Sequence, residues 1–215
     1  MQIQYNKSPR REKIEYIVIH DTGNTNIGAN SEAHFNYFNS GNKGASADCF
    51  VDSNGSLWVN DFNKFYTWHC GDGKGKITNS NSVGIELCVN KDGDYNKAYK
   101  NLIKETVSLA RKLNIKSENI VRHFDASGKN CPASMGKNNW EVWKNFKSEV
   151  GKALSEEFND IDNHYGKEQI KELKAKGIVN GDGKGNFNPE NFLTRGDMAI
   201  IISNLLKYLK DEQYD

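Results

Sequence analysis

The chain has 215 residues and a formal net charge of +1 at pH 7, with 36% hydrophobic and 27% charged residues. This composition predicts a soluble globular protein with one substantial core and room for a small second unit, and the balanced charge argues against nucleic-acid binding. No apolar run approaches bilayer length, and the first ten residues lack the apolar segment of a secretory signal. We therefore expect synthesis in a cytoplasm without a signal peptide, and no membrane partner.

The first predicted strand covers residues 14–20 and ends at His20. Its alternating and then apolar pattern is typical of a central strand in a sheet that is covered on both faces. Ser31–Phe38 follows as a predicted helix, with Ser31 as its N-cap and apolar residues at helical spacing. His34 lies on this helix, and we expect it to pack rather than to take part in chemistry.

A hairpin and a further strand are predicted next. Asp48–Asp52 and Ser56–Val59 flank a short turn that ends in Gly55, so these two segments should pair as antiparallel strands. Phe65–His69 is a short strand, and the glycines of residues 71–75 predict a mobile surface loop.

Val83–Val89 carries the strongest strand signal of the chain, and Glu86 stands within its apolar run. A carboxylate in such a run must be paired, bound to a metal or catalytic. Asn96–Leu113 predicts a long amphipathic helix that covers one sheet face. A later helix should close this domain through an apolar stripe of Trp140, Trp143, Phe146 and Val150. These elements predict an α/β domain over residues 1–153, with a mixed central β-sheet flanked by helices.

A short loop over residues 121–132 brings together His123, Lys129 and Cys131, after a strand that delivers His123. His20, at the end of its own strand, is the best third partner for His123 and Cys131. Two imidazoles and one thiolate suit zinc, and three protein ligands leave a fourth position for water, as in catalytic zinc sites. Taken singly, each of these residues is more often a buried packing or hydrogen-bonded group than a metal ligand.

Five ordered motifs carry a resemblance to a known family. They are Val18–Thr22, Trp68–Gly73, Ser82–Leu87, Arg122–Asp125 and Gly128–Pro132. Over about residues 10 to 150 the chain resembles the zinc N-acetylmuramoyl-L-alanine amidases, a family that includes phage amidase-type lysozymes and peptidoglycan recognition proteins. The resemblance implies a zinc hydrolase that cleaves the amide bond between N-acetylmuramic acid and L-alanine and so lyses bacterial walls.

The resemblance also implies roles for individual residues. Glu86 is expected to carry the proton from the attacking water to the departing amine. Lys129 is expected to stabilise the oxygen that becomes negative in the tetrahedral intermediate. Some family members use a Tyr as the proton carrier, but Ala47 stands at that position here, which favours Glu86. His69 resembles a His that contacts substrate, although a supporting role behind the metal ligands is an equal alternative.

The remaining three cysteines are expected to be reduced packing residues, because cytoplasmic synthesis disfavours disulfides. They are Cys49, Cys70 and Cys88.

Residues 158–215 resemble one surface-layer homology (SLH) repeat, which implies a small all-α domain that binds a wall polymer. Thr194 is predicted to cap its last helix, and Arg195 to pair with an acidic group of the polymer. That helix carries a wide apolar stripe of Met198, Ile201, Ile202, Leu205, Leu206 and Leu209. We expect the stripe to be covered by self-association into a homotrimer or dimer. The alternative is a monomer in which the stripe packs on the first domain.

The combined resemblance implies a phage endolysin of a Gram-positive, clostridial-type host, which acts on the wall after release. A host autolysin exported by another route is an open alternative. Two rival classes are a non-catalytic peptidoglycan receptor of the same fold and a structural surface-layer protein. Retention of a thiolate ligand at Cys131 argues against the receptor. The surface-layer protein leaves His20, Glu86 and Lys129 unexplained.

Overall fold

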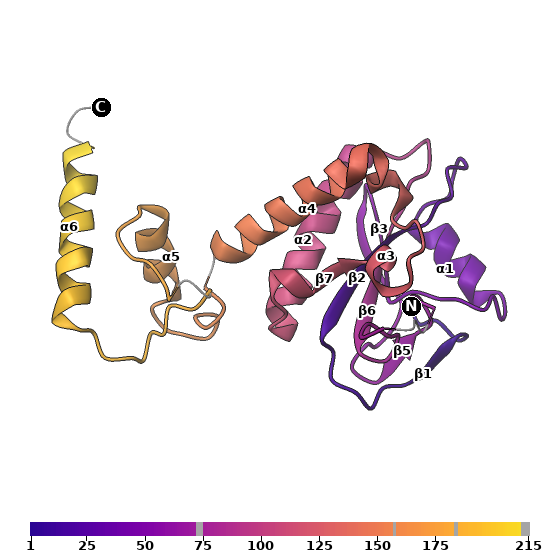
Figure 1. Ribbon diagram of the computed structural model, residues 1–215, viewed down its shortest axis with the longest axis horizontal. Helices are drawn as coiled ribbons and strands as arrows, with labels where there is room; N and C mark the ends of the chain where they lie inside the picture. Colours follow the sequence, from indigo (N-terminus) through magenta and orange to yellow (C-terminus); the bar gives the residue numbers. More distant parts are fainter. Residues whose placement is uncertain (72–74, 157, 183–184, 212–215) are drawn as a thin grey trace. The chain divides into compact units, whose positions relative to one another are not determined.

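A five-stranded mixed sheet forms the centre of the N-terminal unit, with strand order β4-β3-β6-β2-β7 (Figure 1). The strands are β2 (Tyr16–Asp21), β3 (Cys49–Asp52), β4 (Gly55–Trp58), β6 (Ser82–Leu87) and β7 (Ile120–Arg122). β3 and β4 form the predicted antiparallel hairpin, whereas β3–β6, β6–β2 and β2–β7 are parallel pairs. The predicted α/β class with a mixed sheet is confirmed.

The computed structural model describes residues 1–71, 75–156, 158–182 and 185–211. The chain divides into two units, Met1–Gly151 and Lys152–Asp215, each of which is described by itself. Residues 72–74 of the predicted mobile loop lie outside the described part of the chain. Within the described ranges, no helix is both long and apolar enough to span a bilayer.

Helices cover both faces of the sheet, as the apolar run of β2 requires. α1 (Ser31–Asn39) and α2 (Tyr95–Leu113) lie on opposite sides (Figure 1). Trp58 points toward α2, because its indole donates to Glu105 on that helix. The neighbouring strand position, Leu57, packs with the α1 side. Since side chains alternate along a strand, each row of paired residues faces one helix or the other.

One row of paired residues across the sheet, which includes Glu86 and His20, faces α1. Leu57 pairs with Phe50, Phe50 with Glu86, and Glu86 with His20. His34 on α1 stacks on Phe50 with ring centroids 5.7 Å apart, so its predicted packing role is confirmed. The N-cap of α1 is Asn30, one residue before the predicted Ser31. The side chain of Asn30 accepts a hydrogen bond from the backbone N–H of Ala33.

Two short elements differ from the prediction. β1 (Lys7–Pro9) was not predicted, and it forms a separate two-stranded antiparallel sheet with β5 (Phe65–Thr67). A lone three-residue strand carries too little periodicity to be recognised without its partner. The second difference is in β5, which was predicted over Phe65–His69 and ends at Thr67. Two 3-10 helices, Ser117–Asn119 and Ala133–Met135, complete the connections.

The segment predicted as a loop after β7 begins instead with a helix, α3 (His123–Ser127). The carboxylate of Asp125 accepts from the backbone N–H of Arg122 at 2.8 Å and caps its first turn. Gly128, with φ of 79°, ends it in the left-handed region that favours glycine.

The closing helix is α4 (Lys137–Glu156), whose residues Asn138, Asn139 and Trp140 have left-handed backbone angles. Trp143, Phe146 and Val150 are buried as predicted. Trp140 is only half-buried, and its ring lies against Phe124 of α3 rather than in the core.

The C-terminal unit contains α5 (Lys167–Ala175) and α6 (Arg195–Asp211), so its predicted all-α class is confirmed. Its small core consists of Phe158, Ile161 and Ile170, with Phe187 packed against them. Residues 212–215 of the predicted domain lie outside the described residues.

Candidate metal centre

Two neighbouring parallel strands deliver the two histidines of the site. His20 is the fifth residue of β2, and it is 1% exposed. Arg122, at the end of β7, pairs with Ile19, so His123 follows directly beside His20 as the first residue of α3. Cys131 lies in the segment after α3, and its carbonyl accepts from the backbone N–H of Phe124 at 3.0 Å.

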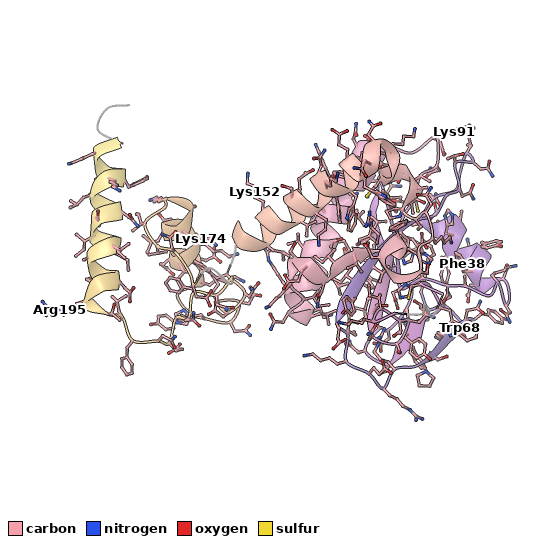
Figure 2. The ribbon with its side chains drawn as sticks, viewed as in Figure 1. Phe38, Trp68, Lys91, Lys152, Lys174 and Arg195 are labelled. Atoms are coloured by element: carbon pink, nitrogen blue, oxygen red, sulfur yellow. The ribbon has the colours of Figure 1, made fainter. Side chains whose placement is uncertain are left out.

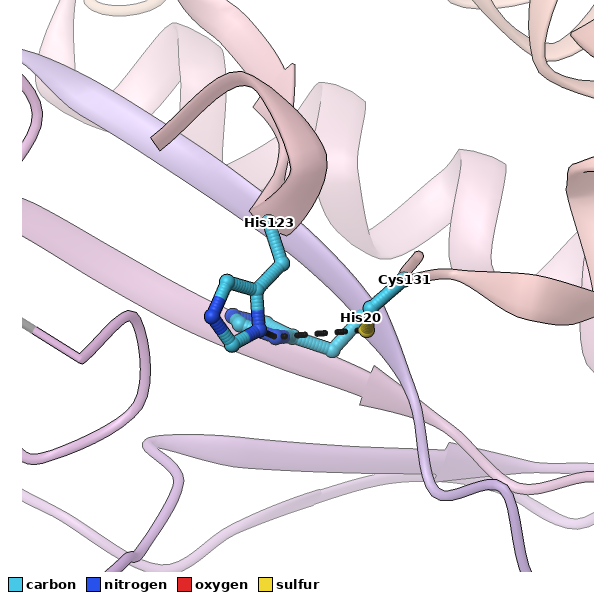
Figure 3. A group of neighbouring side chains, drawn as sticks. All are labelled: His20, His123 and Cys131. Carbon is cyan, nitrogen blue, oxygen red and sulfur yellow. Dashed lines mark hydrogen bonds between the residues drawn. The ribbon is translucent and has the colours of Figure 1, made fainter. Parts of the chain in front are cut away.

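Three ligand atoms converge from these elements (Figure 3). Nδ1 of His20 lies 3.0 Å from Nδ1 of His123 and 3.7 Å from Sγ of Cys131. All three atoms lie within 4.8 Å of one another. The zinc bond lengths of a tetrahedral site place two nitrogens roughly 3.3 Å apart and a nitrogen and a sulfur roughly 3.6 Å apart. The predicted ligands His20, His123 and Cys131 are therefore brought together at a spacing that fits zinc.

Burial sets the protonation of these groups. It holds the pKa of His20 well below the usual range, and burial together with the nearby Lys129 lowers the pKa of His123 to about 4. Both imidazoles are therefore neutral near pH 7, each with a nitrogen lone pair. Burial, reinforced by Glu86, raises the pKa of Cys131 to about 12, so that in the absence of a cation this group is a thiol.

Glu86 lies on β6 directly opposite His20 in the parallel register. Its Oε1 is 4.0 Å from Nδ1 of His20. Its Oε2 is buried and has no hydrogen-bond partner within the described part of the chain. Burial, with a smaller contribution from Asp21, raises the pKa of Glu86 to about 8. A carboxyl group that is held beside a metal site without a partner can accept and return a proton near neutral pH.

A pocket is lined by His123, one of the three predicted ligands, together with Lys129 and His69. Trp68, which is 41% exposed, also lines this pocket. The sequence predicts no role for Trp68, although its place directly before His69 in the Trp68–Gly73 motif is a signal that could have indicated one. Ala47, at the position of the absent Tyr, is buried against Phe50 and Val59.

His69 contacts His20, one of the predicted metal ligands, and also lines the pocket. Its Nδ1 lies 3.0 Å from Nε2 of His20, and its Nε2 lies 3.2 Å from Oγ of Ser82. Burial, with the nearby His123 and Arg10, lowers the pKa of His69 to about 3. Of the two roles considered for His69, the supporting one has direct contacts, whereas the substrate-contacting one has only its place in the pocket wall.

Two further contacts hold the ligand-bearing segments. Oδ2 of Asp21 accepts from the backbone N–H of Ser134 at 2.6 Å and ties the segment after Cys131 to the end of β2. The guanidinium of Arg122 donates twice to Asp125 and lies 4.2 Å from the ring centroid of Trp140. Neither contact was predicted, because Asp21 and Ser134 are 113 residues apart in sequence and the pairing of Arg122 with Asp125 depends on α3, which was not predicted.

In the C-terminal unit, Thr194 occupies its predicted capping position. Its Oγ1 accepts from the backbone N–H of Asp197 at 3.1 Å and donates to the carboxylate of Asp197 at 2.6 Å. Arg195 is exposed at the first residue of α6 (Figure 2). The two residues proposed for polymer binding are thus adjacent at one helix end.

Both units of the chain are similar to known proteins. The sequence profile of N-acetylmuramoyl-L-alanine amidases matches residues 10–134, and that of the S-layer homology domain matches residues 157–199. The amidase XlyA of Bacillus subtilis (strain 168) is 36% identical over 136 residues, which cover 63% of this chain and 44% of that protein. The amidase CwlA of the same strain is 27% identical over 206 residues, covering 94% of this chain and 74% of the relative.

Solved structures show the same similarity. The catalytic domain of XlyA superposes with a TM-score of 0.62 and 31% identity, covering 70% of this chain and 100% of that domain. PlyL superposes with a TM-score of 0.59 and 30% identity, covering 70% of this chain and 97% of the other. The chain spans about half the length of curated relatives such as XlyA and CwlH (44% and 48%). Because the amidase profile matches more than half of the chain, this protein belongs to the N-acetylmuramoyl-L-alanine amidase family.

Proposed function

We propose that residues 1–153 hydrolyse the amide bond between N-acetylmuramic acid and L-alanine in peptidoglycan. The observation that carries this proposal is the convergence of two imidazole nitrogens and one thiol sulfur beside a buried carboxyl group. His20, His123 and Cys131 would hold zinc. When bound, zinc would polarise the scissile carbonyl and lower the pKa of a water toward about 7.

Glu86 is proposed to move the proton. Its carboxyl group lies beside His20 and is not one of the three converging groups, which supports a role toward the reacting water rather than as a metal ligand. It would take a proton from this water and return it to the amine of L-alanine as the amide bond breaks. A group whose pKa lies near the working pH is suited to both transfers.

Lys129 is proposed to stabilise the negative oxygen of the tetrahedral intermediate. It lines the same pocket as His123, and its charge acts on His20, His123 and Glu86. A positive charge in this pocket would stabilise the negative charge that develops on the oxygen in the transition state.

The C-terminal unit, residues 158–215, is proposed to bind an acidic wall polymer through Thr194 and Arg195. Its match to the S-layer homology domain supports a role in attachment to the wall. Thr194 is engaged in the helix cap, so its part is to hold α6, while the guanidinium of Arg195 supplies the charge. Such attachment would keep the catalytic domain near its substrate.

We also propose that α6 mediates assembly into a trimer or dimer. Five apolar side chains of the predicted stripe are between 39% and 55% exposed within one chain: Met198, Ile202, Leu205, Leu206 and Leu209. Light scattering of the whole chain should give a mass above that of the monomer. Leu206→Asp should reduce this mass and Lys207→Asp should not. A monomeric mass for the unmodified chain at micromolar concentration would reject the assembly.

The proposed setting is that of an endolysin, which reaches the wall after release from the cell that makes it. A B. subtilis endolysin variant with 31% identity is among the similar structures. An exported autolysin of the host would use the same chemistry at the same site.

Incubation of the protein with purified walls tests the activity. New peptide N-termini should appear without new reducing sugars, and a chelator should abolish the release while added zinc restores it. Binding to walls without new N-termini would instead identify a non-catalytic receptor. Binding that resides wholly in residues 158–215, without zinc uptake, would favour a structural surface-layer protein.

A further inference from the structure

A chain of buried hydrogen bonds starts at Nε2 of His20, the ring nitrogen that does not face the proposed metal. Nε2 of His20 lies 3.0 Å from Nδ1 of His69, and Nε2 of His69 lies 3.2 Å from Oγ of Ser82. Ser82 in turn donates its hydroxyl hydrogen to the backbone carbonyl of Thr78. Between them, His20, His69 and Ser82 are at most 6% exposed, so water has little access to these contacts.

The Thr78 carbonyl, the last acceptor in this chain, decides which atom donates and which accepts in each hydrogen bond. A carbonyl oxygen can only accept, so the single hydrogen of the Ser82 hydroxyl is committed to Thr78. The Ser82 oxygen must then accept from His69, which places the proton of the neutral His69 ring on Nε2. The bare Nδ1 of His69 must in turn accept from Nε2 of His20.

We infer that His69 and Ser82 are positioning residues that fix the tautomer of His20, with its proton on Nε2 and the lone pair of Nδ1 directed toward the metal. The inference rests on the proposed zinc site. A metal-binding His usually donates its other N–H to a carboxylate, carbonyl or water. Here His69 accepts the Nε2–H of His20. Two further hydrogen bonds, from His69 to Ser82 and from Ser82 to the Thr78 carbonyl, fix the donor and acceptor at each step.

The residues around His69 restrict the position of its ring. A Cβ atom at position 84 would lie 2.6 Å from Cγ of His69, so Gly84 is required for the ring to rest against β6. Oδ1 of Asn79 accepts from the backbone N–H groups of both His69 and Cys70 at 2.9 Å. Asn79 thus fixes the backbone of His69, and close packing against Gly84 fixes its ring.

Ser82→Ala tests the inference with little change in volume. Without the hydroxyl oxygen, His69 Nε2–H loses its acceptor, and the tautomer with the proton on Nδ1 becomes competitive. That tautomer would push the His20 proton onto Nδ1, the ligand nitrogen. We expect the dissociation constant for zinc, measured by competition with a chromophoric chelator, to rise about 10-fold to 100-fold. His69→Phe, which keeps a ring but removes both nitrogens, should weaken zinc binding to a similar extent.

Ser80→Ala is the matched control. Ser80 lies on the same turn, and its hydroxyl contacts Thr78 Oγ1 and Glu12 rather than the chain of hydrogen bonds that starts at His20. This variant should bind zinc as the unmodified protein does.

Nitrogen-15 NMR of the imidazole rings supplies a second measurement that does not depend on activity or on metal. The metal-free protein should carry the His20 proton on Nε2, and Ser82→Ala should show a population with the proton on Nδ1. A role for His69 in substrate contact alone would leave both the zinc affinity and the tautomer unchanged in Ser82→Ala, and that result would overturn the inference. If the unmodified protein bound no zinc, the proposed metal site would itself fail.

Discussion

Glu86 and His20 occupy paired positions on adjacent parallel strands, and Oε1 of Glu86 lies 4.0 Å from Nδ1 of His20. This separation is too long for a hydrogen bond. The carboxyl group therefore stands beside the ligand nitrogen and remains available to a water or an amine at the same site.

Substitution of this carboxyl group should separate chemistry from metal binding. Glu86→Gln keeps the size and hydrogen-bonding ability of the side chain, but it cannot carry a proton at neutral pH. We expect zinc content and fold to be preserved and the rate of N-terminus release to fall by about 10²-fold to 10⁴-fold. Near-normal turnover would move the proton-carrying role elsewhere.

Zinc binding should release protons in a number that depends on Glu86. At pH 7 the thiol of Cys131, with a pKa of about 12, and the carboxyl of Glu86, with a pKa of about 8, are both largely protonated without metal. A dication favours the ionised form of each, so zinc affinity should rise with pH between about 6 and 8. Calorimetry in buffers of different ionisation enthalpy should show about one proton fewer released in Glu86→Gln. Equal release would mean that zinc binding does not change the protonation of Glu86.

The ligand role of Cys131 can be compared with that of another buried cysteine. Cys131→Ser should lose zinc and activity, because an alcohol is a far weaker zinc ligand than a thiolate. Cys88→Ser is the control, since Cys88 packs with Phe50 and Val59 and is not one of the three converging residues. Metal analysis after dialysis checks both variants, and full zinc content in Cys131→Ser would refute the ligand assignment.

Loss of the Lys129 ammonium should slow the reaction without removing the metal. Lys129→Ala removes one stabilising group for the tetrahedral intermediate, and the expected decrease in kcat is on the order of 100-fold to 1,000-fold. The exposed Lys116 serves as a control for a change of one surface charge. A rise in KM with an unchanged kcat in Lys129→Ala would assign this residue to substrate binding instead.

The contact between Arg122 and Asp125 should stabilise α3 and with it the position of His123. Arg122→Gln removes a paired guanidinium that also lies 4.2 Å from the Trp140 ring, and it should lower the free energy of unfolding by about 1–2 kcal/mol. Thermal unfolding at pH 7 measures this change, with Arg11→Gln as the control.

The same contact should weaken in acid. Burial tends to raise the pKa of Asp125, but hydrogen bonds from Arg122 lower it by more, to below its usual range. A carboxylate with a lowered folded pKa stabilises the protein above its unfolded pKa of about 4, and this stabilisation is lost as the pH falls through the folded value. The difference between the unmodified protein and Arg122→Gln should therefore shrink at pH 3. A constant difference would show that ring stacking alone carries the contact.

The sequence by itself determined the strands and the amphipathic helix of the first domain, and the residue types of the site. Alternation along β2 and the apolar run of β6 are local signals, because side chains on a strand face opposite sides in turn. The chemistry of imidazole and thiolate predicted zinc before any distance was known. The short elements, by contrast, were missed or misplaced. α3 has only five residues, its cap is made by the side chain of Asp125, and the ring of its Phe124 contacts Trp140 of α4.

Only the tertiary structure decided which groups touch. His20 and His123 are 103 residues apart in sequence, and parallel pairing of β2 with β7 places their Nδ1 atoms 3.0 Å apart. The same holds for His69, whose sequence motif allowed either a substrate-contacting or a supporting role. The direction of its hydrogen bonds depends on the Thr78 carbonyl, which can only accept. Backbone groups are the same in every residue, so a role set by one carbonyl has no signature in the side chains of the sequence.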